Sequence, residues 1–156
     1  MTLSVEWMTS PQKAKDRVCF LQGIKSKEIT KQDFRRYLLS EHSILHSVIL
    51  TIKVYDFDQF SSVHIARHKH ADHYVTSGRD DWTGKARSID DKKNHLMDIN
   101  CQALIDMSRK RLCNRASEKT LRFMYKLKFE LSNSTDVFMQ ELGRIMHPNC
   151  EYRNGH

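Results

Sequence analysis

The sequence predicts an α+β fold in which a small antiparallel sheet precedes a helical C-terminal half. Between Ser47 and Val54 apolar residues alternate with mostly polar ones, which is typical of a strand with one buried face. From about residue 94 onward the apolar spacing has the period of amphipathic helices. The 156 residues are 39% hydrophobic with only 5 Gly and 2 Pro, so we expect residues 1–156 to form a single domain.

The N-terminal part of the chain predicts a strand followed by two helices. Residues 3–7 alternate between apolar and polar, which favours a short strand. Ser10 followed by Pro11 is typical of a helix start, and Gly23 is typical of a helix end. The segment 30–33, TKQD, resembles a capping pair that opens a second helix.

The remaining segments predict mainly helices after the central strand. Residues 57–66 favour a helix with Phe60, Val63 and Ala66 on its apolar side. Residues 83–94 are polar and without periodicity, which indicates a loop. Three further helices are predicted at roughly 94–113, 117–132 and 135–146.

Charge and cysteine usage restrict the kind of partner and compartment. With 26 Lys and Arg against 19 Asp and Glu, the net charge of +7 favours an anionic partner such as a phosphate on a nucleotide or a polymer. The chain has neither a secretory start nor a long apolar stretch, so we expect a cytoplasmic protein. The four cysteines are widely spread without a CxxC pair, which favours reduced thiols.

The segment RHKHADHYVTSGRDD, residues 67–81, concentrates the candidate ligands. Arg67, Lys69 and Arg79 bracket the pair Ser77-Gly78, and this combination of cations with a close-approach glycine suits phosphate binding. A metal site is the weaker interpretation, because positive charges stand between the histidines and no familiar ligand spacing occurs. An exposed basic loop explains the same composition.

Two further segments carry isolated signals. In NCQALIDMSRKR, Asn100 and Arg111 are eleven residues apart, which on a helix places them on one face about 16 Å apart. They could grip two parts of one long ligand, or be unrelated surface residues. His42, within SEHS, could be a cap, a core residue or an acid/base group.

Together these three segments resemble the flavin-dependent thymidylate synthases. That family has Arg-His-Arg, seven residues, and then Ser, a small residue and Arg; this chain has Arg67-His68-Lys69, seven residues, and Ser77-Gly78-Arg79. Family members also have a histidine at the position that corresponds to His42. An Asn followed eleven residues later by an Arg corresponds to Asn100 and Arg111.

The resemblance implies C5 methylation of dUMP to dTMP, with the one-carbon unit from methylenetetrahydrofolate and hydride from FAD reduced by NADPH. It implies a homotetramer whose sites lie between subunits. The implied FAD-binding residues are Arg67, His68, Lys69, Asn100, Gln102 and Asp106. The implied substrate-binding residues are His64, Ser77, Gly78, Arg79 and Arg111, and the implied catalytic residues are His42, Ser77 and Arg111.

The chain also departs from the family pattern. Lys69 replaces an arginine, Val75 a glutamate and His64 a glutamine, while Gln102 and Asp106 replace an arginine and an asparagine. About fifty residues that bring a further dUMP-binding arginine are absent, and Lys85 or Arg87 could substitute for it. Two alternatives therefore stay open. One is a relative that binds uridine nucleotide and flavin without this catalysis, and the other is a basic nucleic-acid-binding module.

Overall fold

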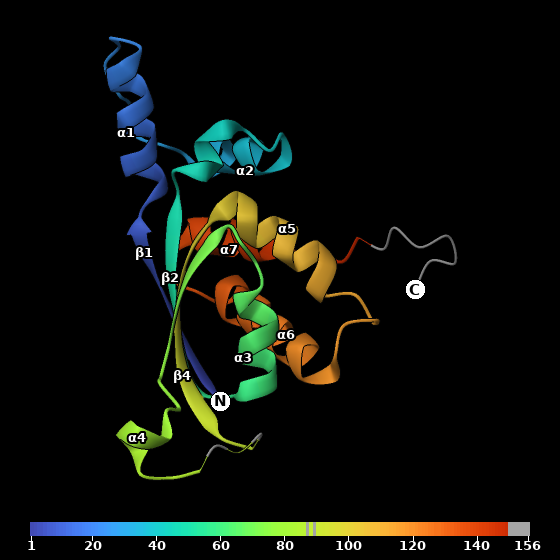
Figure 1. Ribbon diagram of the computed structural model, residues 1–156. Coiled ribbons are helices and arrows are strands. Elements are labelled where there is room, and N and C mark those ends of the chain that lie inside the picture. Colours follow the sequence, from blue (N-terminus) through green and yellow to red (C-terminus); the bar gives the residue numbers. More distant parts are fainter. Residues whose placement is uncertain (87, 89, 150–156) are drawn as a thin grey trace.

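The computed structural model, which describes residues 1–86, 88 and 90–149, is built on a four-stranded antiparallel sheet. The strand order is β1 (Thr2–Thr9), β2 (Ile49–Asp58), β4 (Lys92–Asn100), β3 (Ala71–Val75). Figure 1 shows α3 (Gln59–Ala66) and the helices of the C-terminal half on one side of this sheet. The architecture confirms the predicted α+β class with a small antiparallel sheet.

The central strand β2 is longer than predicted. Leu50, Ile52 and Val54 are at most 2% exposed, as the alternation predicts. The strand continues through Asp58 because the register shifts between Val54 and Phe57, where Asp56 has a φ of 53°. This extra residue returns Phe57 to the core, at 1% exposure.

The N-terminal helices begin and end where their sequence signals predict. Helix α1 (Pro11–Leu21) is capped by Ser10, and Gly23 follows it with a φ of 67°. Helix α2 (Lys31–Leu39) has a reciprocal capping box, in which Thr30 and Asp33 each accept a hydrogen bond from the other's backbone N–H. The short 3-10 helix η1 (Ser43–His46) leads into β2.

The predicted helix at 94–113 is wrong in its first part. Residues 92–100 form β4, and helix α5 (Cys101–Arg111) begins only after Asn100. The alternation of His95, Met97 and Ile99 buries one face of this strand between β2 and β3. Strand β3 likewise lies in a segment for which no element was predicted.

The predicted apolar face of α3 is also wrong. Phe60 and Val63 are exposed, whereas Ser61, Ser62 and Ile65 face the core. The buried serines are tolerated because their hydroxyls have partners: Ser61 donates to Asp58 at 2.8 Å, and Ser62 contacts His95 at 2.9 Å.

The C-terminal helices follow the prediction closely. Helix α6 (Glu118–Ser132) buries Met124, Leu127 and Leu131 completely, and α7 (Val137–Ile145) packs against it. The short helix α4 (Asp80–Thr83) follows β3 at the lower end of the sheet (Figure 1). Within the described residues, no helix is both long and apolar enough to cross a bilayer.

Candidate functional site

His68 is the junction at which two of the sequence motifs meet. It follows α3, where its backbone N–H donates to the Ile65 carbonyl at 3.0 Å. Its ring Nε2 lies 2.9 Å from the Nε of Arg111, the last residue of α5. The two motif residues are 43 positions apart in the sequence. The structure therefore brings the Arg-His-Lys motif to the C-terminal end of α5.

The protonation of His68 follows from this contact. The arginine Nε–H can only donate, so the Nε2 of His68 accepts and its Nδ1 carries the hydrogen. Burial, together with the charges of Arg111 and Lys110, lowers the pKa of His68 to about 4. At neutral pH the ring is uncharged, and it adds an Nδ1–H donor to its cationic surroundings.

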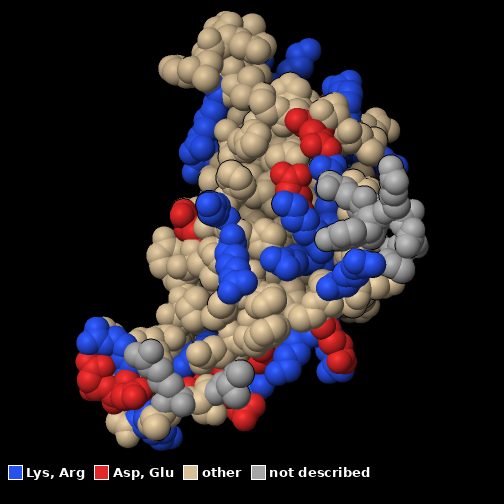
Figure 2. Space-filling view, turned by 45° about the vertical axis from the view of Figure 1, so that its right-hand side comes forward, with Lys and Arg blue, Asp and Glu red and all other residues tan. Residues whose placement is uncertain are grey.

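Positive charge accumulates around this junction. Burial and the nearby Arg67 lower the pKa of the Arg111 guanidinium, although an arginine keeps its charge at neutral pH. Figure 2 shows Lys and Arg side chains gathered on the middle of the face turned toward the viewer. Arg67, Lys110 and Arg111 thus form a cationic cluster suited to phosphate or another anion.

Lys69 and Asn100 line one cavity of about 260 Å³, together with His70, Ala71 and Asp98. Asn100 is the N-cap of α5, since its Oδ1 accepts from the backbone N–H of Ala103 at 2.8 Å. The cap does not use the side-chain NH2 group. Asn100 and Arg111 therefore mark the two ends of α5, as the spacing predicts, although Asn100 lies before the helix and not within it.

Gln102 and Asp106 belong to a polar network on α5. The Nε2 of Gln102 donates to Glu41 at 2.9 Å and to Asp106 at 3.4 Å, and Arg109 contacts both carboxylates. The hydrogen bond from Arg109 lowers the pKa of Glu41. The Oε1 of Gln102 is buried without a hydrogen-bond partner among the described residues. Both residues predicted to hold cofactor are thus engaged with protein side chains.

His42 caps η1, which was one of the roles left open for it. Its Nδ1 accepts from the backbone N–H of Ile44 at 3.2 Å, and its ring lies 5.1 Å from that of Tyr37. The side chain is exposed and follows Glu41, so it lies next to the polar network of α5.

The Ser77-Gly78-Arg79 motif lies beyond the other end of β3. Gly78 and Arg79 line a cavity of about 330 Å³ with Lys93. A Cβ on Gly78 would lie 2.6 Å from the Nζ of Lys93, so the glycine allows the ammonium group to approach the backbone. Ser77 Oγ accepts from the backbone N–H of Arg79 at 3.3 Å.

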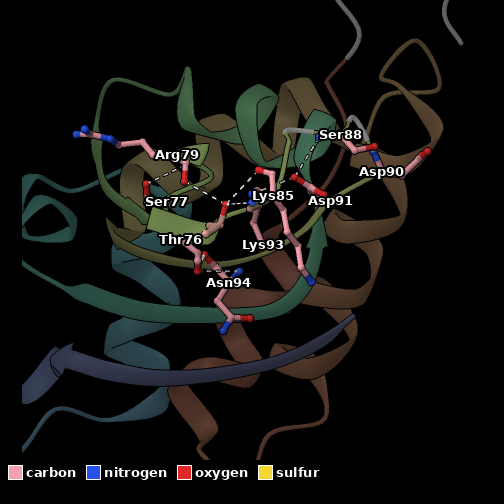
Figure 3. A network of polar contacts seen from close by, with 10 residues as sticks. Thr76, Ser77, Arg79, Lys85, Ser88, Asp90, Asp91, Lys93 and Asn94 are labelled. Atoms are coloured by element: carbon pink, nitrogen blue, oxygen red, sulfur yellow. Dashed lines mark hydrogen bonds and ion pairs between the residues drawn. The ribbon is translucent and has the colours of Figure 1, made fainter. Parts of the chain in front are cut away.

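The side chain of Arg79 is held by residues of helix α4, which it precedes. Its Nε and Nη2 donate to the two carboxylate oxygens of Asp81 at 3.0 and 2.6 Å, and its guanidinium lies 5.4 Å from the Trp82 ring. Figure 3 shows this side chain extending away from the neighbouring network of Thr76, Lys93 and Asn94. The carboxylate of Asp81 occupies the bidentate position that a phosphate would take.

Lys93 is a candidate ligand that sequence reasoning missed. Its side chain is 11% exposed and lies 3.5 Å from Asp91. Of the residues expected to replace the absent arginine, Lys85 is exposed in the loop, and Arg87 lies outside the described residues. The alternation of β4, which places Lys93 and His95 on one side of the strand, was the available signal.

Val75 lines the same cavity, and His64 follows Val63, another of its lining residues. The His64 ring packs on Phe60, with centroids 4.2 Å apart, on the half-exposed side of α3. Val75 lines the cavity and is 42% exposed. An apolar side chain therefore stands where the family pattern has a carboxylate.

The two halves of the candidate site flank the two ends of β3. His68, which contacts Arg111, comes before β3, whereas Ser77 and Arg79 follow it, and five strand residues span about 16 Å. In the described part of the chain, no three His, Cys, Asp or Glu side chains could share a metal ion.

Comparisons with known proteins identify the fold. No protein-family model and no curated protein matches the sequence. Two crystal structures of the flavin-dependent thymidylate synthase ThyX from Helicobacter pylori, both with FAD and dUMP, match the fold. One is 13% identical, with a TM-score of 0.67 over 94% of this chain and 100% of that one. The other is 12% identical, with a TM-score of 0.64 over 90% and 99%. The chain has the fold of these enzymes, which confirms the resemblance at the level of fold.

Proposed function

We propose that this chain, which shares the fold of flavin-dependent thymidylate synthases, binds FAD and a uridine nucleotide and methylates C5 of dUMP. Methylenetetrahydrofolate would supply the carbon, and NADPH would supply the electrons through the flavin. The contact between His68 and Arg111 carries this proposal, because the two residues belong to motifs identified independently in the sequence. Together with the fold match, the contact supports a shared ligand site.

The residues at the His68 junction fit the polar and anionic parts of FAD. Arg67, Lys69 and the Nδ1–H of His68 are donors suited to phosphate oxygens, and the NH2 group of Asn100 is a neutral donor. Bound FAD would supply the hydride. The cavity of about 260 Å³ beside Lys69 is below the usual range for a complete ligand site, so one protomer offers only a part of it.

The residues beyond β3 would hold the nucleotide phosphate. Gly78 provides an open backbone, Arg79 a planar fork and Lys93 a point charge, and all three line one cavity. Ser77 supplies a hydroxyl, and His64 lies on the adjoining helix. Arg111 would contact the pyrimidine, where a fixed cation stabilises the anionic form that precedes attack on the carbon donor.

The separation of these two groups supports assembly from several protomers, as in the homotetramer that the resemblance implies. The length of β3 separates Arg79 from the contact between His68 and Arg111. A complete site would then combine the phosphate-binding end of one protomer with the α5 end of a neighbour.

One observation favours a second candidate, a relative that binds both ligands without catalysing methylation. Val75 stands in place of a carboxylate, and Gln102 and Asp106 are engaged with Glu41 and Arg109. Such a protein would retain the cationic cluster but lack groups that orient the flavin ring.

Flavin spectroscopy followed by a turnover assay tests the proposal. The purified protein is incubated with FAD and titrated with dUMP, and dTMP formation is then measured with methylenetetrahydrofolate and NADPH. We expect bound flavin, a dUMP-dependent absorbance change and product. Flavin binding and a dUMP response without product would select the second candidate, while no flavin binding would refute both.

An arginine-to-lysine pair provides the matched control. Arg111→Lys keeps the charge but loses the Nε–H donor to His68, so we expect it to weaken the dUMP response about tenfold. Arg122→Lys changes an exposed helix residue that pairs with Glu118, and we expect it to behave as wild type. Equal responses of both variants would contradict the role assigned to Arg111.

A further inference from the structure

A chain of three polar side chains, of which Ser62 and His95 are buried, leads from the core to the backbone of His68. The Ser62 hydroxyl lies 2.9 Å from His95 Nδ1, and His95 Nε2 lies 3.0 Å from His73 Nδ1. His73 Nε2 then lies 3.2 Å from the carbonyl oxygen of His68. Ser62 comes from α3, His95 from β4 and His73 from β3, so the chain connects three elements below the site.

The end of this chain fixes its hydrogen-bond direction. A carbonyl only accepts, so the Nε2 of His73 must carry a hydrogen. With both rings neutral, the Nδ1 of His73 accepts from the Nε2–H of His95. The Nδ1 of His95 in turn accepts from the Ser62 hydroxyl. Each ring nitrogen then has one partner and one defined role.

The position of His68 depends on this chain. Its N–H is held by Ile65, its carbonyl by His73 and its ring by Arg111. Without His73, the carbonyl would lose the bond that fixes the turn between α3 and β3. The ring of His68 would then no longer be held at hydrogen-bond distance from Arg111.

We propose that Ser62, His95 and His73 are positioning residues, which hold the His68 turn against Arg111 and so preorganise the cationic cluster for an anionic ligand. The ligand part of this inference rests on the proposed function. The positioning of Arg111 does not, because it can be measured in the protein without ligand.

The burial of the chain distinguishes it from surface polar contacts. His95 and Ser62 are each 2% exposed. Burying two such groups costs free energy unless their bonds are made, and here each has a partner within 3.0 Å. Phe57 packs on the His95 ring at 5.8 Å, which restricts its orientation.

Two substitutions of His73 test the inference. His73→Phe fills a similar volume without polar atoms, whereas His73→Gln retains one acceptor and one donor. His73 is the member of choice because it is only half-buried, so that both variants are expected to fold. His46→Gln, on the exposed surface of η1, is the control for loss of a histidine.

Nuclear magnetic resonance of the full chain at neutral pH gives the primary measurement. We expect Nε2–H tautomers for His73 and His95, an Nδ1–H tautomer for His68, and a protected Nε–H of Arg111. In His73→Phe this Arg111 proton should exchange with water about tenfold faster, while His73→Gln and His46→Gln should remain close to wild type. Unchanged exchange in His73→Phe, or an equal change in His73→Gln, would overturn the positioning role.

FAD affinity gives the second measurement. We expect about tenfold weaker binding in His73→Phe and less than threefold in His73→Gln. If wild type binds FAD and the three variants bind it equally well, the role in ligand binding is refuted while the proposed function stands. If wild type binds no FAD, the proposed function fails, and the exchange of the Arg111 Nε–H alone decides whether the chain positions Arg111.

Discussion

At the scale of single residues, two histidine rings make the stability of the fold depend on pH. Burial lowers the pKa of His95 to about 4, with His73 as the second cause. Burial, Arg111 and Lys110 do the same for His68. In the unfolded chain both rings regain a pKa near 6.5, so the unfolded state binds more protons than the folded state between about pH 4 and 6.5.

We therefore expect stability to fall as the pH is lowered through this window. Each unit of pKa difference corresponds to about 1.4 kcal/mol, and the partial exposure of His68 reduces its share. The free energy of unfolding should drop by about 2 kcal/mol between pH 7 and pH 5, measured by urea denaturation. His68→Gln should show a smaller drop than wild type, and an identical pH dependence would contradict the assignment.

Asp81 is a residue whose removal should strengthen ligand binding. Its carboxylate accepts two hydrogen bonds from the guanidinium of Arg79, so a phosphate must displace the carboxylate to bind there. Both side chains are 57% exposed, so water screens the pair and it competes only weakly with a ligand. Asp81→Asn should therefore bind dUMP about threefold more tightly in a flavin absorbance titration. Glu118→Gln removes another exposed ion pair, to Arg122, and should leave the affinity unchanged. Weaker binding by Asp81→Asn would show that Asp81 assists the ligand.

At the scale of elements, local signals predicted caps and helices better than strands. The capping box at Thr30 and the apolar stripes of α6 and α7 are short-range patterns, and the structure confirms them. Strands β3 and β4 depend on pairing between distant segments, and the short alternation in β4 does not report that pairing. The apolar residues of β4 are followed directly by those of α5. The alternation of the strand was therefore read as part of the helical spacing, and one helix was predicted for both elements.

The candidate site divides in the same way. The resemblance implied that the Arg67-His68-Lys69 motif and Arg111 serve one site, and His68 lies 2.9 Å from Arg111, while the roles assigned to these residues stay predictions. Lys93, His73 and His95 were not found, because their roles depend on strands β3 and β4, which were not predicted. The Asp81 contact with Arg79 depends on the turn geometry of α4, which composition alone does not specify.

The packing of α7 on α6 provides an element-scale prediction. A Cβ on Gly143 would lie 2.7 Å from the backbone nitrogen of Ser132 and 3.1 Å from the carbonyl carbon of Leu131. Because backbone atoms cannot rotate away, Gly143→Ala must push the helices apart, at a cost of about 2–3 kcal/mol in unfolding free energy. Glu130→Ala, on the exposed face of α6, should change it by less than about 0.5 kcal/mol. A neutral Gly143→Ala variant would show that the helices can separate without loss of packing.

At the scale of the whole molecule, the open question is how one nucleotide could contact both cationic regions. Arg111 contacts His68, which comes before β3, and Arg79 lies beyond the other end of this strand. The rigid sheet prevents these ends from approaching one another, since β3 is paired along its length with β4. Under the proposed function, a shared site would combine the phosphate-binding end of one protomer with the α5 end of a second.

This arrangement predicts complementation between two defective chains. Arg79→Ala should lose the phosphate contact and Arg111→Ala the pyrimidine contact, so each variant alone should show little dUMP-dependent change in flavin absorbance. When the two are co-expressed with different tags and hybrid oligomers are isolated, an Arg79→Ala chain supplies Arg111 and its neighbour supplies Arg79. Random mixing then restores about one quarter of the sites, and the absorbance change should recover to that fraction of wild type. If Arg79 and Arg111 of one site came from the same chain, every site in a hybrid would lack one of the two arginines. The hybrids would then be as inactive as the single variants.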